Sequence, residues 1–142
     1  RRKPFSRLTT SGPRAVRILM GDFNVTPDSP RYTWLVGRGW LDAQRAAGGP
    51  ECDPASGTGC TSGREDTSLA ALRDPGARES ERIDFVFVQP PAGCTPRFDG
   101  ANDPDRDGLG TGPFAAEGAV DGPGGLVWAS DHTAVSMDMS CS

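Results

Sequence analysis

Polar residues that could do chemistry occur in three clusters, each at one end of a stretch that is typical of a β-strand. The clusters are Asp22 with Asn24, Asp84, and Asp131 with His132. The first cluster follows the apolar run 16–20, and the other two stand at the starts of the runs 82–88 and 133–139. If the first strand runs toward a site and the other two run away from it, all five side chains meet at one edge of a sheet.

Such a meeting point favours a bound cation. Several carboxylates in one cleft repel one another unless a cation lies among them, and all-oxygen ligands favour Mg²⁺, Mn²⁺ or Ca²⁺. His132 is the only histidine of the chain. A lone histidine is often structural, but one that follows an acid and lies where acidic clusters converge is a candidate catalytic residue. Either Asp84 or Asp131 could fix its tautomer.

Three strands are expected to position these clusters. The run 16–20 predicts a buried strand that delivers polar groups at its carboxyl end. The nearly continuous apolar residues of 82–88 predict a strand that is buried on both faces. The alternating pattern of 133–139 predicts a strand with one buried face.

A short helix is expected between the first two strands. Ser29 suits its N-cap and Pro30 its first turn, and a glycine-containing stretch ends it after Val36. This helix would bury Trp34 and Leu35. The content of 19 glycines and 13 prolines in 142 residues also predicts short elements joined by loops.

The chain length suits one domain. Residues 1–14 are basic and irregular, and we expect a linker or the tail of a preceding segment there, with the domain in residues 15–142. Residues 1–50 carry nine Arg and Lys against three Asp and Glu, whereas residues 51–142 carry six against sixteen. The basic leading end could face phosphate, and the alternative is a solvated basic arm.

The cysteines Cys52, Cys60, Cys94 and Cys141 include no CxxC pair, which favours disulfides over zinc; the alternative is reduced, buried thiols. Four cysteines permit three pairings. A Cys52–Cys60 bond closes a short loop and leaves Cys94–Cys141. These last two lie ten and nine residues after the second and third polar clusters, so parallel strands would carry them to similar depth. Disulfides indicate an oxidising compartment, and we expect a secreted or extracellular protein.

Three motifs carry a resemblance to a known family. They are GDFN at 21–24, RID at 82–84 and SDH at 130–132. In this order, each beside its strand, they resemble the carboxyl-terminal half of the endonuclease/exonuclease/phosphatase superfamily, which has the DNase I-like fold. The resemblance implies an α/β (α+β) fold, a four-layer α/β sandwich of two mixed sheets flanked by helices, of which this chain holds about half.

The resemblance also implies a role for each polar residue. Asp22 would orient and deprotonate the attacking water, and Asn24 would hydrogen-bond the scissile phosphate or the nucleophile. His132 would stabilise the phosphoryl oxygens in the transition state, and Asp84 would hold His132. Asp131 would help to bind a divalent metal, Mg²⁺ or Mn²⁺.

The superfamily's other half supplies an early Asn and a metal-binding Glu, and nothing before Val16 matches these residues. We expect them in a missing amino-terminal half, which would be the partner of this chain. The alternative is that this piece binds metal poorly and is inactive alone.

A second acidic feature has the alternating acids of a Ca²⁺ loop at Asp103, Asp105 and Asp107, followed by Gly108. It lacks the bidentate Glu of such loops, because Phe114 stands at that position. A solvated acidic loop is therefore favoured over a calcium site.

The resemblance implies a secreted, metal-dependent hydrolase of phosphoester bonds, either a phosphodiesterase or a nuclease. A sphingomyelinase-like enzyme or a small-molecule phosphatase is the alternative within the family, and a non-catalytic binding module that keeps the fold is the alternative of another class. The basic leading end favours nucleic acid, whereas acidic residues within 99–121 would repel a polyanion if they line the cleft. The start at Arg1 and the lack of a membrane-spanning apolar stretch predict a soluble piece of a longer protein.

Overall fold

The computed structural model describes residues 15–63, 78–99, 112–113, 119–122, 125–128, 132–133 and 135–142. Several features that the sequence singles out lie outside these residues. They are the basic segment 1–14, the acidic loop at Asp103, Asp105 and Asp107, and the candidate metal ligand Asp131.

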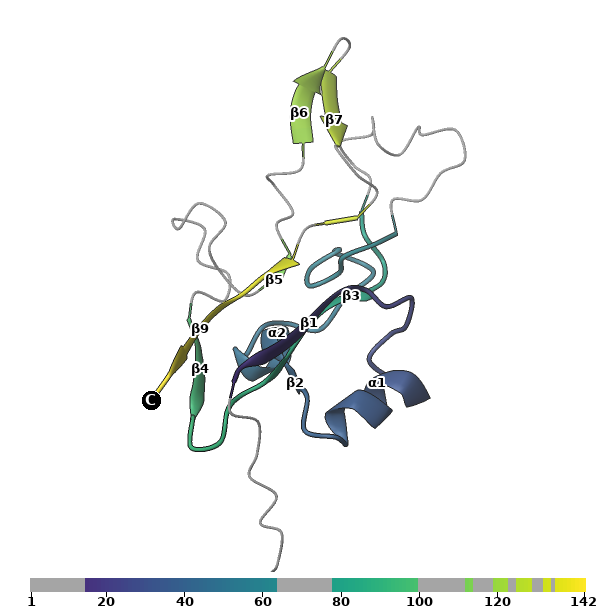
Figure 1. Ribbon diagram of the computed structural model, residues 1–142. Helices are drawn as coiled ribbons and strands as arrows, with labels where there is room; N and C mark the ends of the chain where they lie inside the picture. Colours follow the sequence, from purple (N-terminus) through teal and green to yellow (C-terminus); the bar gives the residue numbers. More distant parts are fainter. Residues whose placement is uncertain are drawn as a thin grey trace, which may run out of the picture.

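Short strands and two short helices make up the described chain (Figure 1). They are β1 (Arg17–Asp22), α1 (Pro30–Val36), β2 (Leu41–Asp42), α2 (Ala43–Ala46), β3 (Asp84–Gln89), β4 (Pro96–Asp99), β5 (Gly112–Pro113), β6 (Ala119–Gly122), β7 (Gly125–Trp128), β8 (Val135–Ser136) and β9 (Asp138–Cys141). The order β1-β3-β2 forms a three-stranded sheet, and β4-β9, β5-β8 and β6-β7 form two-stranded ladders. All these pairs are antiparallel.

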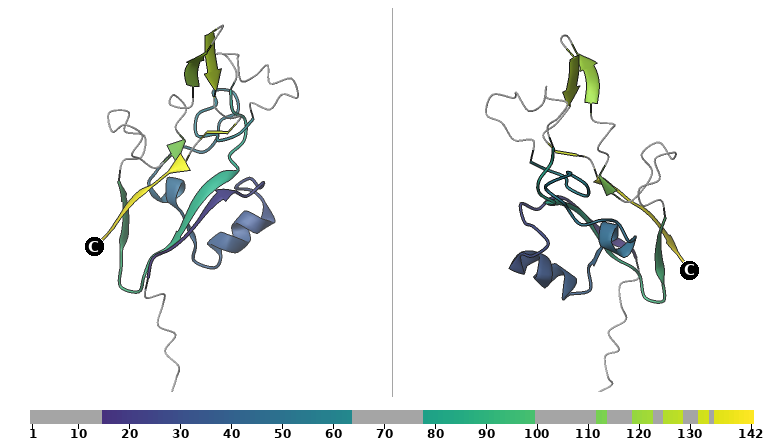
Figure 2. Two further views of the ribbon diagram at one scale, coloured as in Figure 1. Left: turned by 45° about the horizontal axis from the view of Figure 1, so that its top comes forward. Right: turned by 180° about the vertical axis from the view of Figure 1, so that it is seen from behind.

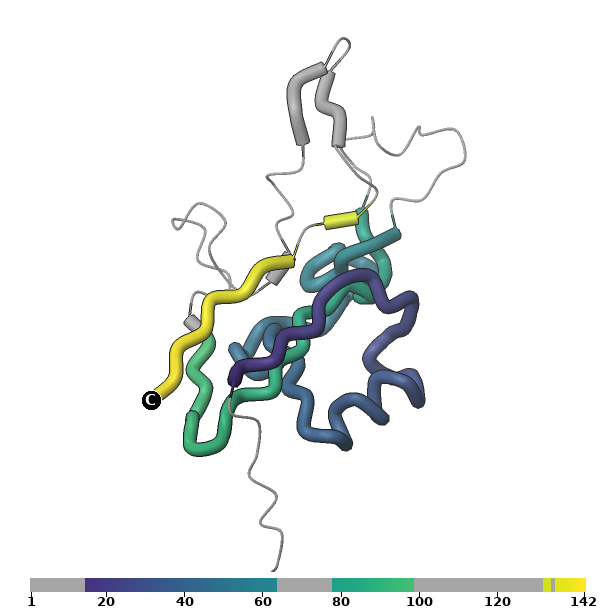
Figure 3. The backbone as a smooth tube through the Cα atoms, in the orientation of Figure 1, coloured from purple at the N-terminus to yellow at the C-terminus, as the bar shows by residue number. Residues whose placement is uncertain are grey.

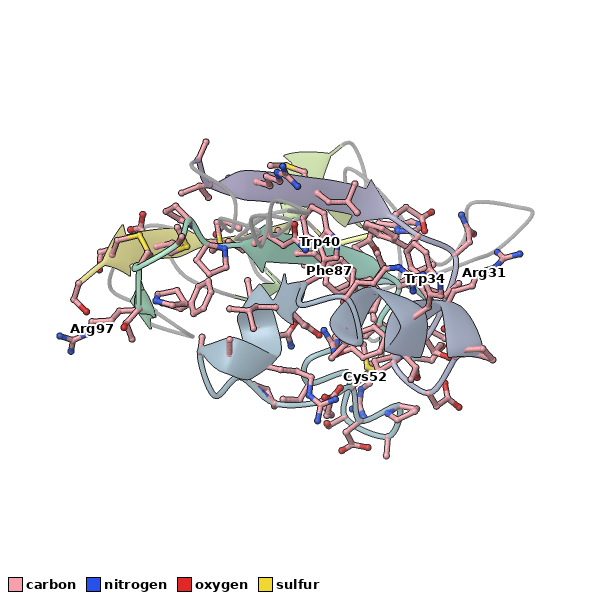
Figure 4. The ribbon with its side chains drawn as sticks, turned by 60° about the horizontal axis from the view of Figure 1, so that its bottom comes forward. Arg31, Trp34, Trp40, Cys52, Phe87 and Arg97 are labelled. Atoms are coloured by element: carbon pink, nitrogen blue, oxygen red, sulfur yellow. A yellow bond between two sulfur atoms is a disulfide. The ribbon has the colours of Figure 1, made fainter. Side chains whose placement is uncertain are left out.

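Strand β3 is the core of the molecule, as its continuous apolar sequence predicts. Its side chains alternate between two hydrophobic clusters because successive residues of a strand point to opposite faces. Phe85 and Phe87 pack with Tyr32 of α1, whereas Val86 and Val88 pack with Ala43 of α2. Accordingly, α1 and α2 lie on opposite sides of the sheet (Figure 2). Figure 4 shows Phe87 of β3 beside Trp40, and Trp40 packs against the cluster that contains Phe87 and Tyr32.

Helix α1 has the predicted bounds but buries a different aromatic residue. The Ser29 hydroxyl accepts a hydrogen bond from the Tyr32 N–H at 3.2 Å, which caps the helix as expected. The expected burial of Trp34 is wrong, because its side chain is 54% exposed and lies under the guanidinium of Arg38. Tyr32 is buried instead, and Leu35, three residues further on the same helix face, packs beside it.

Strand β1 is exposed along its whole length, so the prediction of a buried strand is wrong. Met20 is 66% exposed, and Ile18 and Leu19 are also exposed. The reason is its place in the sheet. β1 is an edge strand with β3 as its neighbour, and apolar residue type alone does not distinguish an edge strand from a central one.

The last strands of the chain are β8 and β9. The single strand predicted over 133–139 is therefore divided in two, with Met137 between the two pieces. Val135, Met137 and Met139 pack against the second cluster of β3, so the alternating pattern is confirmed. β9 runs beside β4 (Figure 3), and the Cys94–Cys141 disulfide links the two segments at that end. A second disulfide, Cys52–Cys60, closes the loop after α2. No helix in the described part of the chain has the length and apolarity needed to cross a membrane.

Candidate functional site

The antiparallel register of β1 and β3 brings two of the predicted acids together. Asp22 is the last residue of β1 and lies directly opposite Asp84, the first residue of β3. His132 joins them from the far end of the chain. Potential ligand atoms of these three residues all lie within 4.8 Å of one another. Asp22, Asp84 and His132 therefore meet at one end of the paired strands β1 and β3, as the sequence predicts for these three residues.

His132 is oriented by Asp84. Its Nδ1 lies 2.9 Å from Oδ2 of Asp84, which favours the tautomer that carries its proton on Nδ1 when the ring is neutral. Of the two acids that the sequence left open for this role, the structure brings Asp84 to the ring; Asp131 lies outside the described residues. The His132 side chain remains 26% exposed.

The turn after β1 presents the Asp22 carboxylate. The backbone N–H of Asn24 donates to Oδ1 of Asp22 at 2.7 Å, and Asn24 adopts a left-handed conformation with φ of 50°. Asn tolerates that conformation better than most residues. Gly21, with φ of 139°, provides a second backbone conformation that side chains rarely adopt. These constraints fix one carboxylate oxygen while Asp22 and Asn24 both remain exposed.

Two hydroxyl residues that the sequence analysis missed lie beneath the site. Thr61 and Ser62 are fully buried, and the Ser62 Oγ lies 3.5 Å from Nε2 of His132. The Thr61 hydroxyl contacts the backbone of Asp84. Their position directly after Cys60 is a weak signal, because nothing in the sequence tells which strands the disulfide loop will contact.

A buried ion pair also went unpredicted. Arg82 precedes Asp84 by two residues and donates to Oδ2 of Asp42 at 2.8 Å and to Oε2 of Glu51 at 3.0 Å. The Tyr32 hydroxyl donates to the same Asp42 oxygen at 2.8 Å. Burial, followed by this hydrogen bond, raises the pKa of Tyr32 above its ordinary value. The RID motif contains Arg82, but only the folded chain brings Asp42 and Glu51 to it.

The donor set fits a divalent cation. Two carboxylates of opposing strands offer oxygen ligands close to one point, which is the chemistry that Mg²⁺ and Mn²⁺ prefer. His132 Nδ1 is engaged by Asp84, so the oxygens of Asp22 and Asp84 are the better candidate ligands.

Comparison with known proteins agrees with this geometry. The model of the Endonuclease/Exonuclease/phosphatase family matches residues 4–132. Neither the search of curated proteins nor the search of solved structures found a match. The family match spans most of the chain, includes all the residues of the site, and implies the DNase I-like α/β fold that the motifs predicted. This chain belongs to the Endonuclease/Exonuclease/phosphatase family.

Proposed function

We propose that this chain carries the Asp22, Asp84 and His132 part of the active site of a divalent-metal-dependent phosphodiesterase that acts on nucleic acid. The observation that carries the proposal is the convergence of these three side chains within 4.8 Å, with His132 oriented by Asp84. Members of the family are generally hydrolytic enzymes, which supports phosphoester hydrolysis as the reaction.

In this proposal the free oxygen of Asp22 orients the attacking water and takes its proton. Asn24 hydrogen-bonds the scissile phosphate or the nucleophile. Protonated His132 donates from Nε2 to a phosphoryl oxygen, while Asp84 accepts from Nδ1 and stabilises the imidazolium. An aspartate with a pKa near ~4 is a weak base. A bound Mg²⁺ or Mn²⁺ would supply the missing activation by lowering the pKa of the water and neutralising phosphoryl charge.

Charge supports nucleic acid as the substrate. The excess of Arg and Lys in residues 1–50 suits a polyanion, and the exposed Arg31 of α1 follows the loop that begins at the site. Figure 4 shows Arg31 directed outward from α1 beside Trp34. A phospholipid headgroup or a small phosphate ester shares the same reacting group, so these substrates are further arms of the test.

The exposed edge of β1 supports a second part of the proposal. Ile18, Leu19 and Met20 present apolar side chains beside Asp22, where a covering segment would also complete the metal site. We propose that this cover and the remaining metal ligands come from the amino-terminal half of the family's domain. The two disulfides support secretion as the location of the protein.

The decisive experiment measures Mg²⁺-dependent hydrolysis of a chromogenic phosphodiester by the full-length gene product. Asp22→Asn and His132→Ala are expected to lower kcat by about 100-fold or more, because each removes a group that acts on the reacting atoms. Asp28→Asn is the control, because Asp28 is an exposed acid of the same loop. Equal rates in all four proteins would contradict the proposal and favour a binding module. Plasmid nicking, sphingomyelin cleavage and phosphomonoester hydrolysis then identify the substrate.

A further inference from the structure

We infer that Thr61 is a positioning residue, whose hydroxyl fixes the backbone of Asp84 and thereby the Asp84–His132 pair. The inference rests on the proposed function and adds to it a residue outside the three family motifs. Where β3 begins, the side chain of Thr61 accepts the backbone hydrogen bonds that a neighbouring strand would otherwise accept.

The Thr61 hydroxyl accepts two backbone hydrogen bonds at this point. Its Oγ1 lies 3.1 Å from the N–H nitrogen of Ile83 and 3.1 Å from that of Asp84. A hydroxyl oxygen has two lone pairs, so one threonine can satisfy both donors. On the opposite side, the carbonyl of Ile83 accepts from the N–H of Phe23 at 2.9 Å. The backbone that leads into Asp84 is therefore held from both sides.

The same segment also holds the backbone of His132. Ser62 forms a β-bridge with His132, and the carbonyl of Thr61 accepts from the N–H of Thr133 at 2.9 Å. The segment is itself tied to the residues just before β3, because the N–H groups of Thr61 and Ser62 both donate to the carbonyl of Glu81, at 2.7 and 3.0 Å. One dipeptide thus sets the distance between the acid and the imidazole.

This arrangement matters because the Asp84–His132 hydrogen bond depends on distance and angle. It measures 2.9 Å, near the optimum, and hydrogen bonds weaken as donor and acceptor separate or lose alignment. Replacing Thr61 by Val preserves its volume but leaves the buried N–H of Ile83 and the partly buried N–H of Asp84 without their acceptor. Relief of that penalty requires the start of β3 to shift, and Asp84 shifts with it. Serine keeps the acceptor and loses only a methyl group.

The test compares Thr61→Val, Thr61→Ser and Val88→Ala in the full-length gene product. Val88 is buried near the other end of β3, so its truncation lowers stability without touching the site. Thr61→Val is expected to lower kcat for the chromogenic phosphodiester by about 10-fold with KM unchanged. Thr61→Ser should restore most of that loss, and Val88→Ala should retain the wild-type kcat at a temperature where it stays folded. Thr61→Ala replaces the valine variant if the latter does not fold.

A second measurement does not depend on activity. The downfield Nδ1 proton resonance of His132, identified by its absence in His132→Gln, reports the bond to Asp84 directly. It should shift or broaden in Thr61→Val and stay in place in Thr61→Ser and Val88→Ala. An unmoved resonance, or a kcat loss equal to that of Val88→Ala, would overturn the positioning role. If instead Asp22→Asn or His132→Ala retained full activity, the proposed function would fail, and the resonance alone would decide the role of Thr61.

Discussion

The guanidinium of Arg82 and the carboxylate of Asp42 form an ion pair inside the core, with side chains that are 1% and 3% exposed. The pair joins the segment that leads into β3 to the junction of β2 and α2, and Arg82 lies two residues before Asp84 of the candidate site. A charge this deeply buried depends on its partner, because removal of one member leaves the other without compensation.

Arg82→Met is therefore expected to lower the free energy of unfolding by about 3–5 kcal/mol. Urea denaturation measures this change. The control is Arg45→Met, because Arg45 contacts Glu51 at 3.0 Å in an exposed ion pair that should contribute no more than about 1 kcal/mol. Similar midpoints for the two variants would contradict the structural importance of the buried pair.

Asp84→Asn is expected to lower kcat by about 10- to 100-fold, because an amide cannot stabilise the His132 imidazolium as a carboxylate does. Steady-state kinetics with saturating Mg²⁺ measures the loss. Asp138→Asn is the matched control, since Asp138 is an exposed strand acid of β9. Wild-type kcat in Asp84→Asn would show that the 2.9 Å contact has no part in turnover.

The raised pKa of Tyr32 predicts a loss of stability in alkali. The folded state holds the phenolic proton more tightly than the unfolded state, whose tyrosine pKa is about 10. The resulting stabilisation is complete below that pH and is lost as the pH rises through the folded-state pKa. Tyr32 is the only tyrosine of the chain, so tyrosinate absorbance of the 142-residue protein follows it directly. The thermal unfolding temperature of Tyr32→Phe should fall less steeply above about pH 10 than that of the wild-type protein. An equal decline in both proteins would refute the linkage.

The two disulfides are expected to differ in their effects. Cys94 and Cys141 are 47 residues apart and Cys52 and Cys60 are 8 apart, so loop-closure entropy predicts stabilisation of about 4 and about 2.5 kcal/mol respectively. Double Cys→Ser variants compared by thermal unfolding measure this order. The shorter loop leads directly into Thr61, so its variant should show the larger fall in kcat at a temperature where both remain folded. The reverse order in kcat would contradict the link between this loop and the site.

Helix α1 and strand β3 were predictable because their signals are local. Ser29 and Pro30 determine where the helix begins, since a cap and a preset φ act within one turn. The continuous apolar residues of β3 require cover on both faces wherever the strand lies. The pairing of Cys52 with Cys60 was likewise indicated by the short loop between them.

The face of α1 and the exposure of β1 were not predictable, because they depend on distant neighbours. Tyr32 rather than Trp34 is buried because Asp42 and the rings of β3 lie on its side of the helix. Met20 is exposed because β1 lies at the edge of the sheet, and strand order is absent from local sequence.

The sequence by itself determined the residue types of the site: an acid and an amide after one strand, an acid at the start of the next, and a single histidine before the last. Tertiary structure decided which of them meet, because the antiparallel register sets Asp22 opposite Asp84 and long-range contacts bring His132 to Asp84. It also decided that Thr61 and Ser62 lie beneath them. A hydrogen bond needs about 3 Å between its atoms, and for residues so far apart in the chain only the packed fold sets that distance.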